Sequence, residues 1–392
     1  MPTSRKLHIG LIAAFLVLIG VVAPSQIIWE LRDGERPQIV DLFRQRPARA
    51  NLRQFESRLE SNCRLAQVVR PWVQYARFVL FEDAGDKALV GRAGWFFYRP
   101  AVQYLIEPWS PVCSVPARAF EETPHGVTTN GQGDIFAAIV SFRDDLAKHG
   151  IKLLVMPAPN KASVYPEMLA ARAAGMSEPV NAKTRDVLTR LKSAGIETVN
   201  LFEVYGQARR VAGSPDYYLA QDSHWSPEGI RLAADVVARR LLDSRWVEKG
   251  PVKYETKPVT VERYGDVLWM IRVPQVEQLY EPQRMDCTQV IDAASGQPYK
   301  DDPNSPVLVL GDSFLRIFER DEPGSGGFIA HLAHNLGFGV TSIVNDGGAS
   351  TLVRQQLATR PSLLKGKKVV IWEFVERDIR FGTEGWQVIR VP

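Results

Sequence analysis

The stretch Val307-Leu308-Val309-Leu310-Gly311-Asp312-Ser313-Phe314 determines how this chain is expected to fold. Its four consecutive apolar residues, two of them β-branched, are typical of a strand that is buried on both faces. The strand ends at a glycine, which permits a tight turn, and a helical pattern follows. This order places Ser313 at the carboxyl edge of a parallel sheet, where open α/β folds bind their ligands.

Outside this stretch, apolar runs at residues 152–156, 340–344 and 367–374 and a strand-like segment at residues 197–201 predict the rest of the sheet. Amphipathic helical patterns separate these runs, at residues 134–149, 183–194 and 226–242. Asp134 and Ser226 are residue types that cap helix N-termini, and Gly150 is a typical helix stop. The sequence therefore predicts an α/β fold: a parallel sheet with helices on both faces.

The first 89 residues differ from the rest of the chain. Arg5 and Lys6 precede an apolar stretch at residues 9–22, which resumes at residues 27–29. Together these parts give roughly the 20 residues that a helix needs to cross a bilayer. We predict a signal-anchor over residues 1–30 that binds the inner membrane and leaves the remaining chain in the periplasm. A cleaved signal peptide is the alternative, although no good cleavage site follows.

Two further boundaries follow from composition. Residues 31–89 look helical and charged, and are predicted to form a stalk. Residues 90–392 are predicted to form the α/β domain. Within it, residues 247–302 hold prolines and short β-like runs, so we interpret them as a β-rich insertion.

The bulk composition excludes some classes of function. The 392 residues include 48 basic and 44 acidic ones, a net charge of +4, without a dense basic run that would favour nucleic acid. Cys63, Cys113 and Cys287 form no CxxC pair, so a zinc site is not expected. In an oxidising compartment, one disulfide and one free thiol are expected, with the pairing left open.

A reactive serine needs a base, and His224 is the candidate among the six histidines. In Asp222-Ser223-His224, the aspartate can accept the Nδ1 proton and leave Nε2 free to act on Ser313. The alternatives are a helix-capping role for Ser313, and either polar loop residues or a metal pair for Asp222 and His224. No third metal ligand is evident, so we predict no metal.

The remaining histidines are weaker candidates. His331 and His334 are expected on a partly exposed helix face, and His125 remains open.

Three further residues lie near these motifs. Gly347, after the strand at residues 340–344, is a candidate oxyanion donor, and a plain turn is the alternative. Trp225 and Phe314 are candidates for stacking on a sugar ring. Their alternative role is in the core beneath the site.

Four motifs together resemble a known family. Gly91-x-x-Gly94-Trp95-Phe96-Phe97-Tyr98, Pro157-x-Pro159-x-Lys161, Asp222-Ser223-His224-Trp225 and Gly311-Asp312-Ser313-Phe314 occur in the order seen in alginate O-acetyltransferases of the AlgJ/AlgX type, within the SGNH-like hydrolase group. The resemblance covers roughly residues 90–380. It implies that Ser313 is the nucleophile, His224 the base and Asp222 the residue that orients it.

The resemblance also implies an activity. We expect transfer of acetyl groups onto an exported, alginate-like polysaccharide through an acetyl-serine, with a membrane-bound acyltransferase as acetyl donor and no cofactor. A polysaccharide deacetylase or acetylesterase with the same triad is the alternative. A non-catalytic polysaccharide-assembly protein is the other alternative.

Overall fold

The computed structural model describes residues 3–42, 44, 48–108, 133–176 and 180–391. The chain divides into two compact units. The first comprises Met1–Ala84 and Arg272–Val276, and the second comprises Gly85–Ile271 and Glu277–Pro392.

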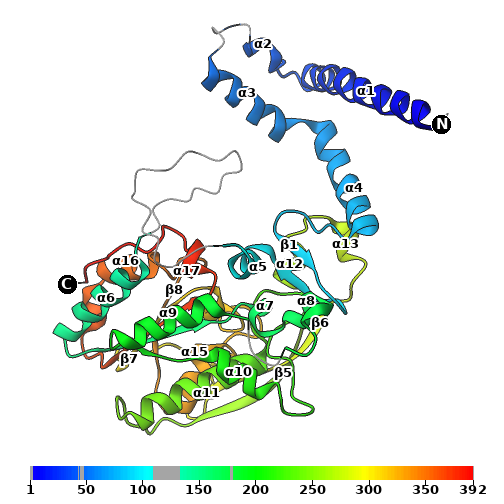
Figure 1. The fold of residues 1–392 in the computed structure, drawn as a ribbon. Coiled ribbons are helices and arrows are strands. Elements are labelled where there is room, and N and C mark those ends of the chain that lie inside the picture. Colours follow the sequence, from blue (N-terminus) through cyan, green and yellow to red (C-terminus); the bar gives the residue numbers. More distant parts are fainter. Residues whose placement is uncertain (1–2, 43, 45–47, 109–132, 177–179, 392) are drawn as a thin grey trace. The chain divides into compact units, whose positions relative to one another are not determined.

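The second unit is built on a five-stranded parallel sheet (Figure 1). Its order is β4 (Glu197–Thr198), β3 (Lys152–Ala158), β9 (Val369–Val375), β7 (Val307–Gly311) and β8 (Thr341–Val344). Every neighbouring pair runs parallel. The α/β fold and its parallel sheet, predicted from the apolar runs, are confirmed.

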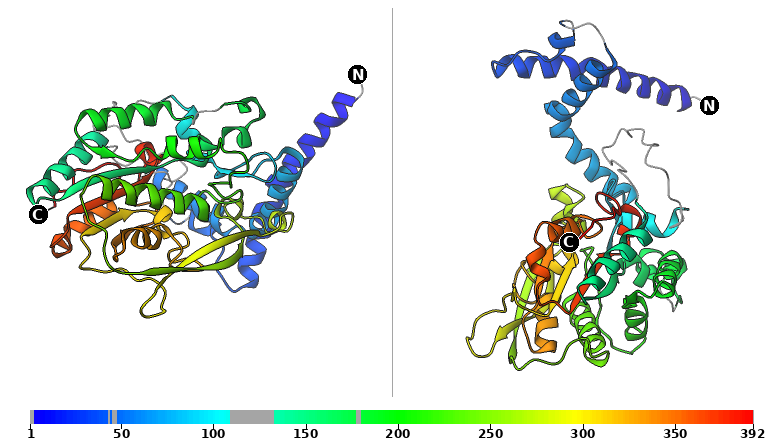
Figure 2. Two further views of the ribbon diagram at one scale, coloured as in Figure 1. Left: turned by 90° about the horizontal axis from the view of Figure 1, so that it is seen from below. Right: turned by 90° about the vertical axis from the view of Figure 1, so that its left-hand side faces the viewer.

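Helices cover both faces of this sheet, as the views in Figures 1 and 2 show. Leu153 and Val155 of β3 join a core with α6 (Ile135–Lys148), α9 (Ala182–Ser193) and α16 (Leu352–Ala358). Leu154 and Met156 join the opposite core, with α10 (Leu201–Ala208), α11 (Pro227–Asp243) and α15 (Phe328–Leu336). Successive side chains of a strand point to opposite faces, so a strand covered on both sides must be apolar at every position.

The helix boundaries follow the capping signals. Asp134 accepts a hydrogen bond from the Phe136 amide at 2.8 Å, and Ser226 accepts one from the Gly229 amide at 3.1 Å. Gly150 follows α6 with a φ of +70°, a conformation that favours glycine. These starts and stops confirm the predicted helices.

One strand is shorter than its sequence indicates. The sequence pattern at residues 197–201 predicts a strand throughout, but β4 ends at Thr198. Asn200 accepts a hydrogen bond from the Glu203 amide at 3.4 Å and caps α10, so Leu201 is already helical.

Two small antiparallel sheets accompany the main one. β1 (Ala88–Val90) pairs with β2 (Phe96–Tyr98), and β5 (Tyr254–Arg263) pairs with β6 (Gln283–Asp292) along ten residues each. The second sheet lies within the segment interpreted as a β-rich insertion. The short helices are α5 (Arg99–Ile106), α7 (Lys161–Val164), α8 (Pro166–Leu169), α12 (Asp266–Trp269), α13 (Pro274–Glu277), α14 (Ser313–Arg316) and α17 (Asp378–Phe381), with 3-10 turns at Ala171–Ala173 and Pro361–Leu364.

The first unit is helical. It contains α1 (Thr3–Arg32), α2 (Ile39–Leu42), α3 (Arg49–Asn62) and α4 (Arg64–Phe81). Among the described residues, no helix combines the length and the apolar character that crossing a membrane requires. The described helices therefore do not support the signal-anchor predicted for residues 1–30.

Two of the three cysteines bear on the expected disulfide. Cys63 and Cys287 are both free and buried. Burial raises the pKa of the Cys287 thiol to about 12, which keeps it protonated and unreactive. Cys113 and His125 lie outside the described residues.

Candidate active site

Ser313, His224 and Asp222 form one hydrogen-bonded chain. Nε2 of His224 lies 2.8 Å from the Ser313 hydroxyl, and Nδ1 lies 2.6 Å from Oδ1 of Asp222. Ser313 begins α14 at the end of β7, and the other two residues come from the loop before α11. The structure therefore brings together the three residues that the sequence selects as nucleophile, base and orienting carboxylate.

A hairpin-like loop presents His224 and Asp222. Tyr218 and Trp225 form an antiparallel bridge across its base, and the Leu219 amide donates a 3.2 Å hydrogen bond to the His224 carbonyl. The bridge fixes the backbone on both sides of the Asp222–His224 segment. The loop thus places the His224 side chain next to Ser313, although His224 and Asp222 are not part of the main sheet.

The Asp222 carboxylate is fully buried but well supplied with donors. Oδ1 accepts from Nδ1 and from the backbone amide of His224, and Oδ2 accepts from the Arg263 guanidinium at 2.8 Å and the Asp266 amide at 3.0 Å. Burial by itself would raise the pKa of Asp222, but His224 and Arg263 hold it well below its usual range. Asp222 is therefore ionised at neutral pH and faces Nδ1 in the geometry that orients a catalytic imidazole.

Charge also sets the state of His224. Burial favours the neutral imidazole, yet the Asp222 charge and hydrogen bond outweigh it, and the pKa of His224 is raised above its usual value. A raised pKa makes the imidazole a stronger base toward the hydroxyl on its other side.

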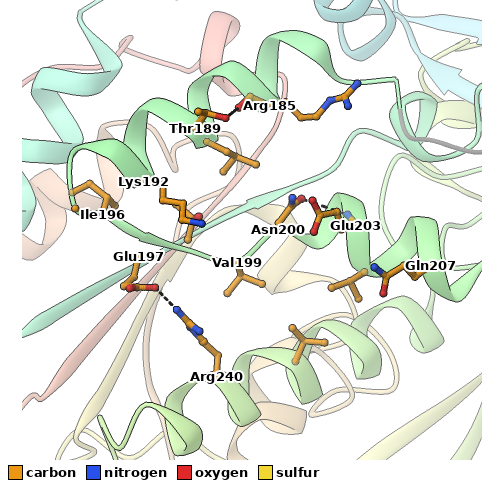
Figure 3. Close-up of a pocket in the computed structure, with 15 residues that line it drawn as sticks. Arg185, Thr189, Lys192, Ile196, Glu197, Val199, Asn200, Glu203, Gln207 and Arg240 are labelled. Atoms are coloured by element: carbon orange, nitrogen blue, oxygen red, sulfur yellow. Dashed lines mark hydrogen bonds and ion pairs between the residues drawn. The ribbon is translucent and has the colours of Figure 1, made fainter.

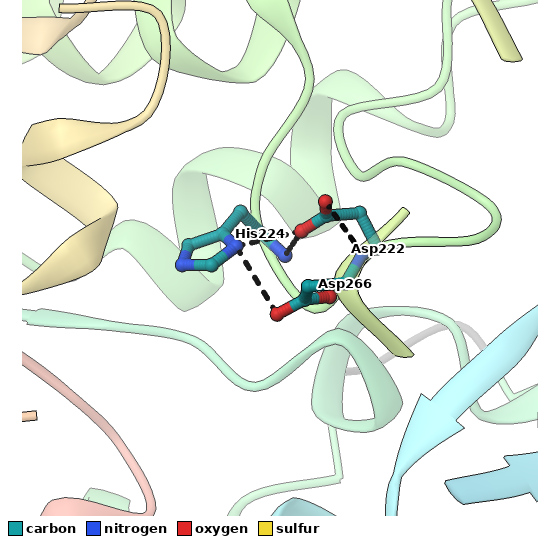
Figure 4. A group of neighbouring side chains, drawn as sticks. All are labelled: Asp222, His224 and Asp266. Atoms are coloured by element: carbon teal, nitrogen blue, oxygen red, sulfur yellow. Dashed lines mark hydrogen bonds and ion pairs between the residues drawn. The ribbon is translucent and has the colours of Figure 1, made fainter. Parts of the chain in front are cut away.

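Asp266 is a second carboxylate beside His224 (Figure 4). Its Oδ2 lies 3.7 Å from Nδ1 of His224, and its oxygens accept hydrogen bonds from the Ser223 amide and hydroxyl at 2.6 and 2.7 Å. Asp222, His224 and Asp266 present possible ligand atoms within 4.8 Å of one another. However, each Asp222 oxygen already accepts two hydrogen bonds, and one of these four comes from the Arg263 guanidinium. This arrangement fits a catalytic triad better than a metal centre.

The segment interpreted as an insertion supports this site directly. Arg263 ends β5, and Asp266 begins α12. Between them, Gly265 approaches the catalytic loop so closely that a Cβ there would lie 2.2 Å from the carbonyl of Gln221. The segment at residues 247–302 therefore contributes Arg263, Gly265 and Asp266 to the site.

A buried lysine holds the catalytic loop from the other side. Nζ of Lys161, at the start of α7, donates to the carbonyls of Leu219 and Ala220 at 2.9 Å and to that of Asp222 at 2.6 Å. The ammonium also lies 5.0 Å from the centre of the Phe97 ring. Burial lowers the pKa of Lys161 to about 7, against the opposing charges of Asp222 and Asp266. Three short bonds to carbonyls use all three protons of an ammonium, so we assign the charged form.

We expect Lys161→Met to destabilise the protein. The substitution leaves three carbonyls without their buried donor, at a cost of about 3 kcal/mol in the free energy of unfolding. Urea denaturation measures the change. Lys192→Met, at an exposed lysine of α9, is the matched control and should stay within about 0.5 kcal/mol of the wild type. Equal stability of the two variants would show that Lys161 does not hold the loop.

Two buried carboxyl groups support the turn that carries Ser313. Oε2 of Glu373 accepts a hydrogen bond from the Asp312 backbone amide at 3.0 Å. The Asp312 carboxyl group accepts hydrogen bonds from the backbone amides of Phe314 at 2.9 Å and Val375 at 3.2 Å. A Cβ at Gly311 would lie 2.4 Å from the same Glu373 oxygen, so this close approach requires glycine. Burial and the nearby Asp312 raise the pKa of Glu373 well above its usual range, which favours its protonated form.

The aromatic candidates are core residues. Trp225 has no exposed surface, and its indole N–H donates to the Phe314 carbonyl at 2.9 Å. Phe314 is equally buried, with its ring centre 4.8 Å from that of His224. A side chain without exposed surface has no face for a sugar ring, so Trp225 is not a substrate-binding residue in this structure. The alternative, a role in the core beneath the site, holds for both.

The remaining expectations concern Gly347 and His331. Gly347 lies in the turn after β8 with a φ of +66°, but its role as oxyanion donor stays a prediction. His331, expected on a partly exposed face, is buried within α15, and burial lowers its pKa to about 4. The expectation was wrong for His331 because its side of α15 packs into the core, whereas His334 is partly exposed as expected.

A groove of about 640 Å³ lies elsewhere on the second unit, along β4, α9 and α10 (Figure 3). Arg185, Lys192 and Arg240 are among its lining residues, and no triad residue is. The groove is therefore separate from the catalytic geometry.

Several supporting residues have only weak local signals in the sequence. Arg263 and Asp266 lie in a segment without the α/β rhythm, and only tertiary contact brings them to Asp222. Lys161 stands in a recognisable motif, but its three acceptors are backbone carbonyls about 60 residues away. Such contacts leave no trace in residue spacing.

Comparison with known proteins supports the same family. Residues 88–376 match the model of the family described as the SGNH hydrolase-like domain of acetyltransferase AlgX. A probable alginate O-acetylase AlgJ of Pseudomonas fluorescens is 26% identical over 258 residues, which cover 64% of this chain and 62% of that protein. The alginate biosynthesis protein AlgX of Pseudomonas aeruginosa is 25% identical over 64% of this chain and 52% of its own length. The chain thus spans about half to six-tenths of these two relatives.

A solved structure shares the fold. The O-acetyltransferase domain of Pseudomonas putida AlgJ matches with a TM-score of 0.54 at 20% identity, covering 75% of this chain and 92% of that domain. Because the family match extends over most of the chain, this protein belongs to the AlgX-type SGNH hydrolase-like family.

Proposed function

We propose that this chain is an O-acetyltransferase that moves acetyl groups onto an exported, alginate-like polysaccharide through an acetyl-Ser313 intermediate. The observation that carries the proposal is the hydrogen-bonded chain from Ser313 through His224 to Asp222, at 2.8 and 2.6 Å. Membership of the AlgX-type family supports acyl transfer, and the relatives named for alginate support a polysaccharide acceptor.

In the first half-reaction, Nε2 of His224 takes the proton of the Ser313 hydroxyl. The serine oxygen bonds to the acetyl carbon of the donor, and the donor group leaves with the proton from His224. The backbone N–H of Ser313 lies in the first turn of α14, where helix amides have no intrahelical acceptor. It is one proposed donor to the oxyanion, and the Gly347 N–H is the second.

The second half-reaction reverses these roles. A sugar hydroxyl gives its proton to His224 and attacks the acetyl carbon of acetyl-Ser313. The serine oxygen then leaves and recovers the proton. If water takes the place of the sugar, the same steps release acetate, which is the deacetylase or acetylesterase alternative.

The proposed partners follow from where the reaction takes place. The basic and apolar N-terminal sequence supports export to the periplasm. Acetyl groups there need a supplier, and we propose a membrane-bound acyltransferase. A reporter fused after Pro392 tests this location: it should be active in the periplasm, and activity only in the cytoplasm would contradict it.

The decisive comparison is between transfer and hydrolysis. We expect purified protein to O-acetylate an oligosaccharide acceptor when supplied with a small acetyl ester, and the acceptor to accelerate breakdown of the acetyl-enzyme. Mass spectrometry of the oligosaccharide measures the product, and Ser313→Ala is the control. Acetate released only as free acid, across both uronate and neutral oligosaccharides, would replace the transferase by the esterase.

A further inference from the structure

Helix α4, in the first unit, carries an exposed apolar face. Its members recur at spacings of three and four residues, which places them on one side of the helix. They are Val68, Val69, Trp72, Val73, Val79 and Leu80, and each side chain is between 43% and 70% exposed. Phe78, on the other side of α4, is the residue of this helix that is buried. A continuous apolar stripe of this kind on a soluble surface marks an interaction site.

The charge on helix α4 itself has one sign, although Arg64 and Arg77 pair with Asp33 and Asp83 outside the helix. Helix α4 contains Arg64, Arg70 and Arg77 and no acidic residue. Residues 36–81 hold nine arginines against Asp41, Glu56 and Glu60. Residues 85–392 hold 36 basic and 36 acidic residues, so the net charge of +4 comes entirely from the first 84. The complementary surface must therefore be both apolar and anionic.

We propose that α4 lies along the surface of an anionic phospholipid membrane. The apolar face enters the boundary between headgroups and acyl chains, while the arginines contact the lipid phosphates. Trp72, at the middle of the face, has the amphipathic ring that favours this depth. Arginines at three points along the helix keep α4 in the plane of the interface. This inference goes beyond the proposed catalytic function and does not depend on it.

Fluorescence quenching tests the depth of Trp72. The full chain is added to vesicles of phosphatidylglycerol and phosphatidylcholine with brominated acyl chains, and its emission is compared with that of Trp72→Phe. The difference isolates Trp72 from the other tryptophans. We expect this component to be at least halved by the brominated lipid, with hydrolysis of a soluble acetyl ester unchanged in both proteins.

Charge is tested with a matched pair of variants. Arg70→Gln/Arg77→Gln should raise the lipid concentration for half-maximal quenching of Trp72 by on the order of 30-fold, since each basic residue near an anionic surface contributes comparably. Arg239→Gln/Lys249→Gln makes the same charge change at exposed residues of the second unit and should have no effect.

Three results would overturn the proposal. The first is Trp72 emission that brominated chains do not quench, even if the chain sediments with vesicles through another segment. The second is the same lipid concentration for half-maximal quenching in both double variants, which would show that the α4 arginines do not bind anionic lipid. The third is shielding of Trp72 by concentration-dependent dimerisation without lipid, which would assign the face to a second copy of this chain.

Discussion

Ser313→Ala is expected to lower acetyl-ester turnover by about 10⁴-fold or more, because the substitution removes the oxygen that we propose as the acceptor of the acetyl group. His224→Ala should cost a similar factor, and the double variant should cost little more. The three triad residues act as one unit, so their effects on the rate do not add. Stopped-flow or steady-state hydrolysis of a chromogenic acetyl ester measures the loss.

The control for this prediction is an exposed serine in the same unit. Ser362→Ala, in a 3-10 turn, should retain the wild-type rate. Both variants should unfold at about the wild-type denaturant concentration, since a single hydroxyl at a half-buried position contributes little to stability. Near-normal turnover in folded Ser313→Ala would exclude Ser313 as nucleophile.

The second large effect is expected for Asp222→Asn, at about 10⁴-fold in turnover. The amide can no longer fix the Nδ1–H tautomer of His224, and the Arg263 guanidinium is left beside a neutral group. The substitution also removes the charge that raises the pKa of His224. The rate falls as pH drops through this pKa, because only the neutral imidazole accepts a proton. In the wild type this acid limb should therefore lie above pH 6.5, the usual pKa of histidine.

The residual activity of Asp222→Asn should show its acid limb at lower pH than the wild type. Asp266→Asn is the matched control, because its carboxylate is 3.7 Å from Nδ1 rather than 2.6 Å. We expect this variant to lose about tenfold or less, as its hydrogen bonds go to Ser223. An acid limb unchanged by Asp222→Asn, or a larger loss in Asp266→Asn, would contradict the assignment of Asp222.

The sheet is predictable because its strands are covered on both faces. Residues 307–310 must be apolar at every position, and such runs are visible without a structure. Helix ends are predictable where one side chain decides them, as at Asp134 and Ser226. The end of β4 depends instead on competition between a strand and the cap at Asn200, which the strand-like pattern does not reveal.

The triad is predictable for a similar local reason. Asp222 and His224 are two residues apart, and Ser313 directly follows a buried strand, so each has a sequence signature. The supports of the triad do not. Arg263 approaches through the pairing of β5 with β6, and Lys161 approaches through backbone carbonyls. Burial of Trp225 likewise depends on Phe314 and Phe328, which pack against it from elsewhere in the chain.

The central claim is that Ser313 carries the acetyl group during turnover. Its most direct test is mass spectrometry of the protein, rapidly acid-quenched during reaction with an acetyl ester and digested. We predict one added acetyl group on the peptide that contains Ser313, which is lost faster when an oligosaccharide acceptor is present. Turnover that continues with no acetyl group on this peptide, or with the group on a different residue, would contradict the account.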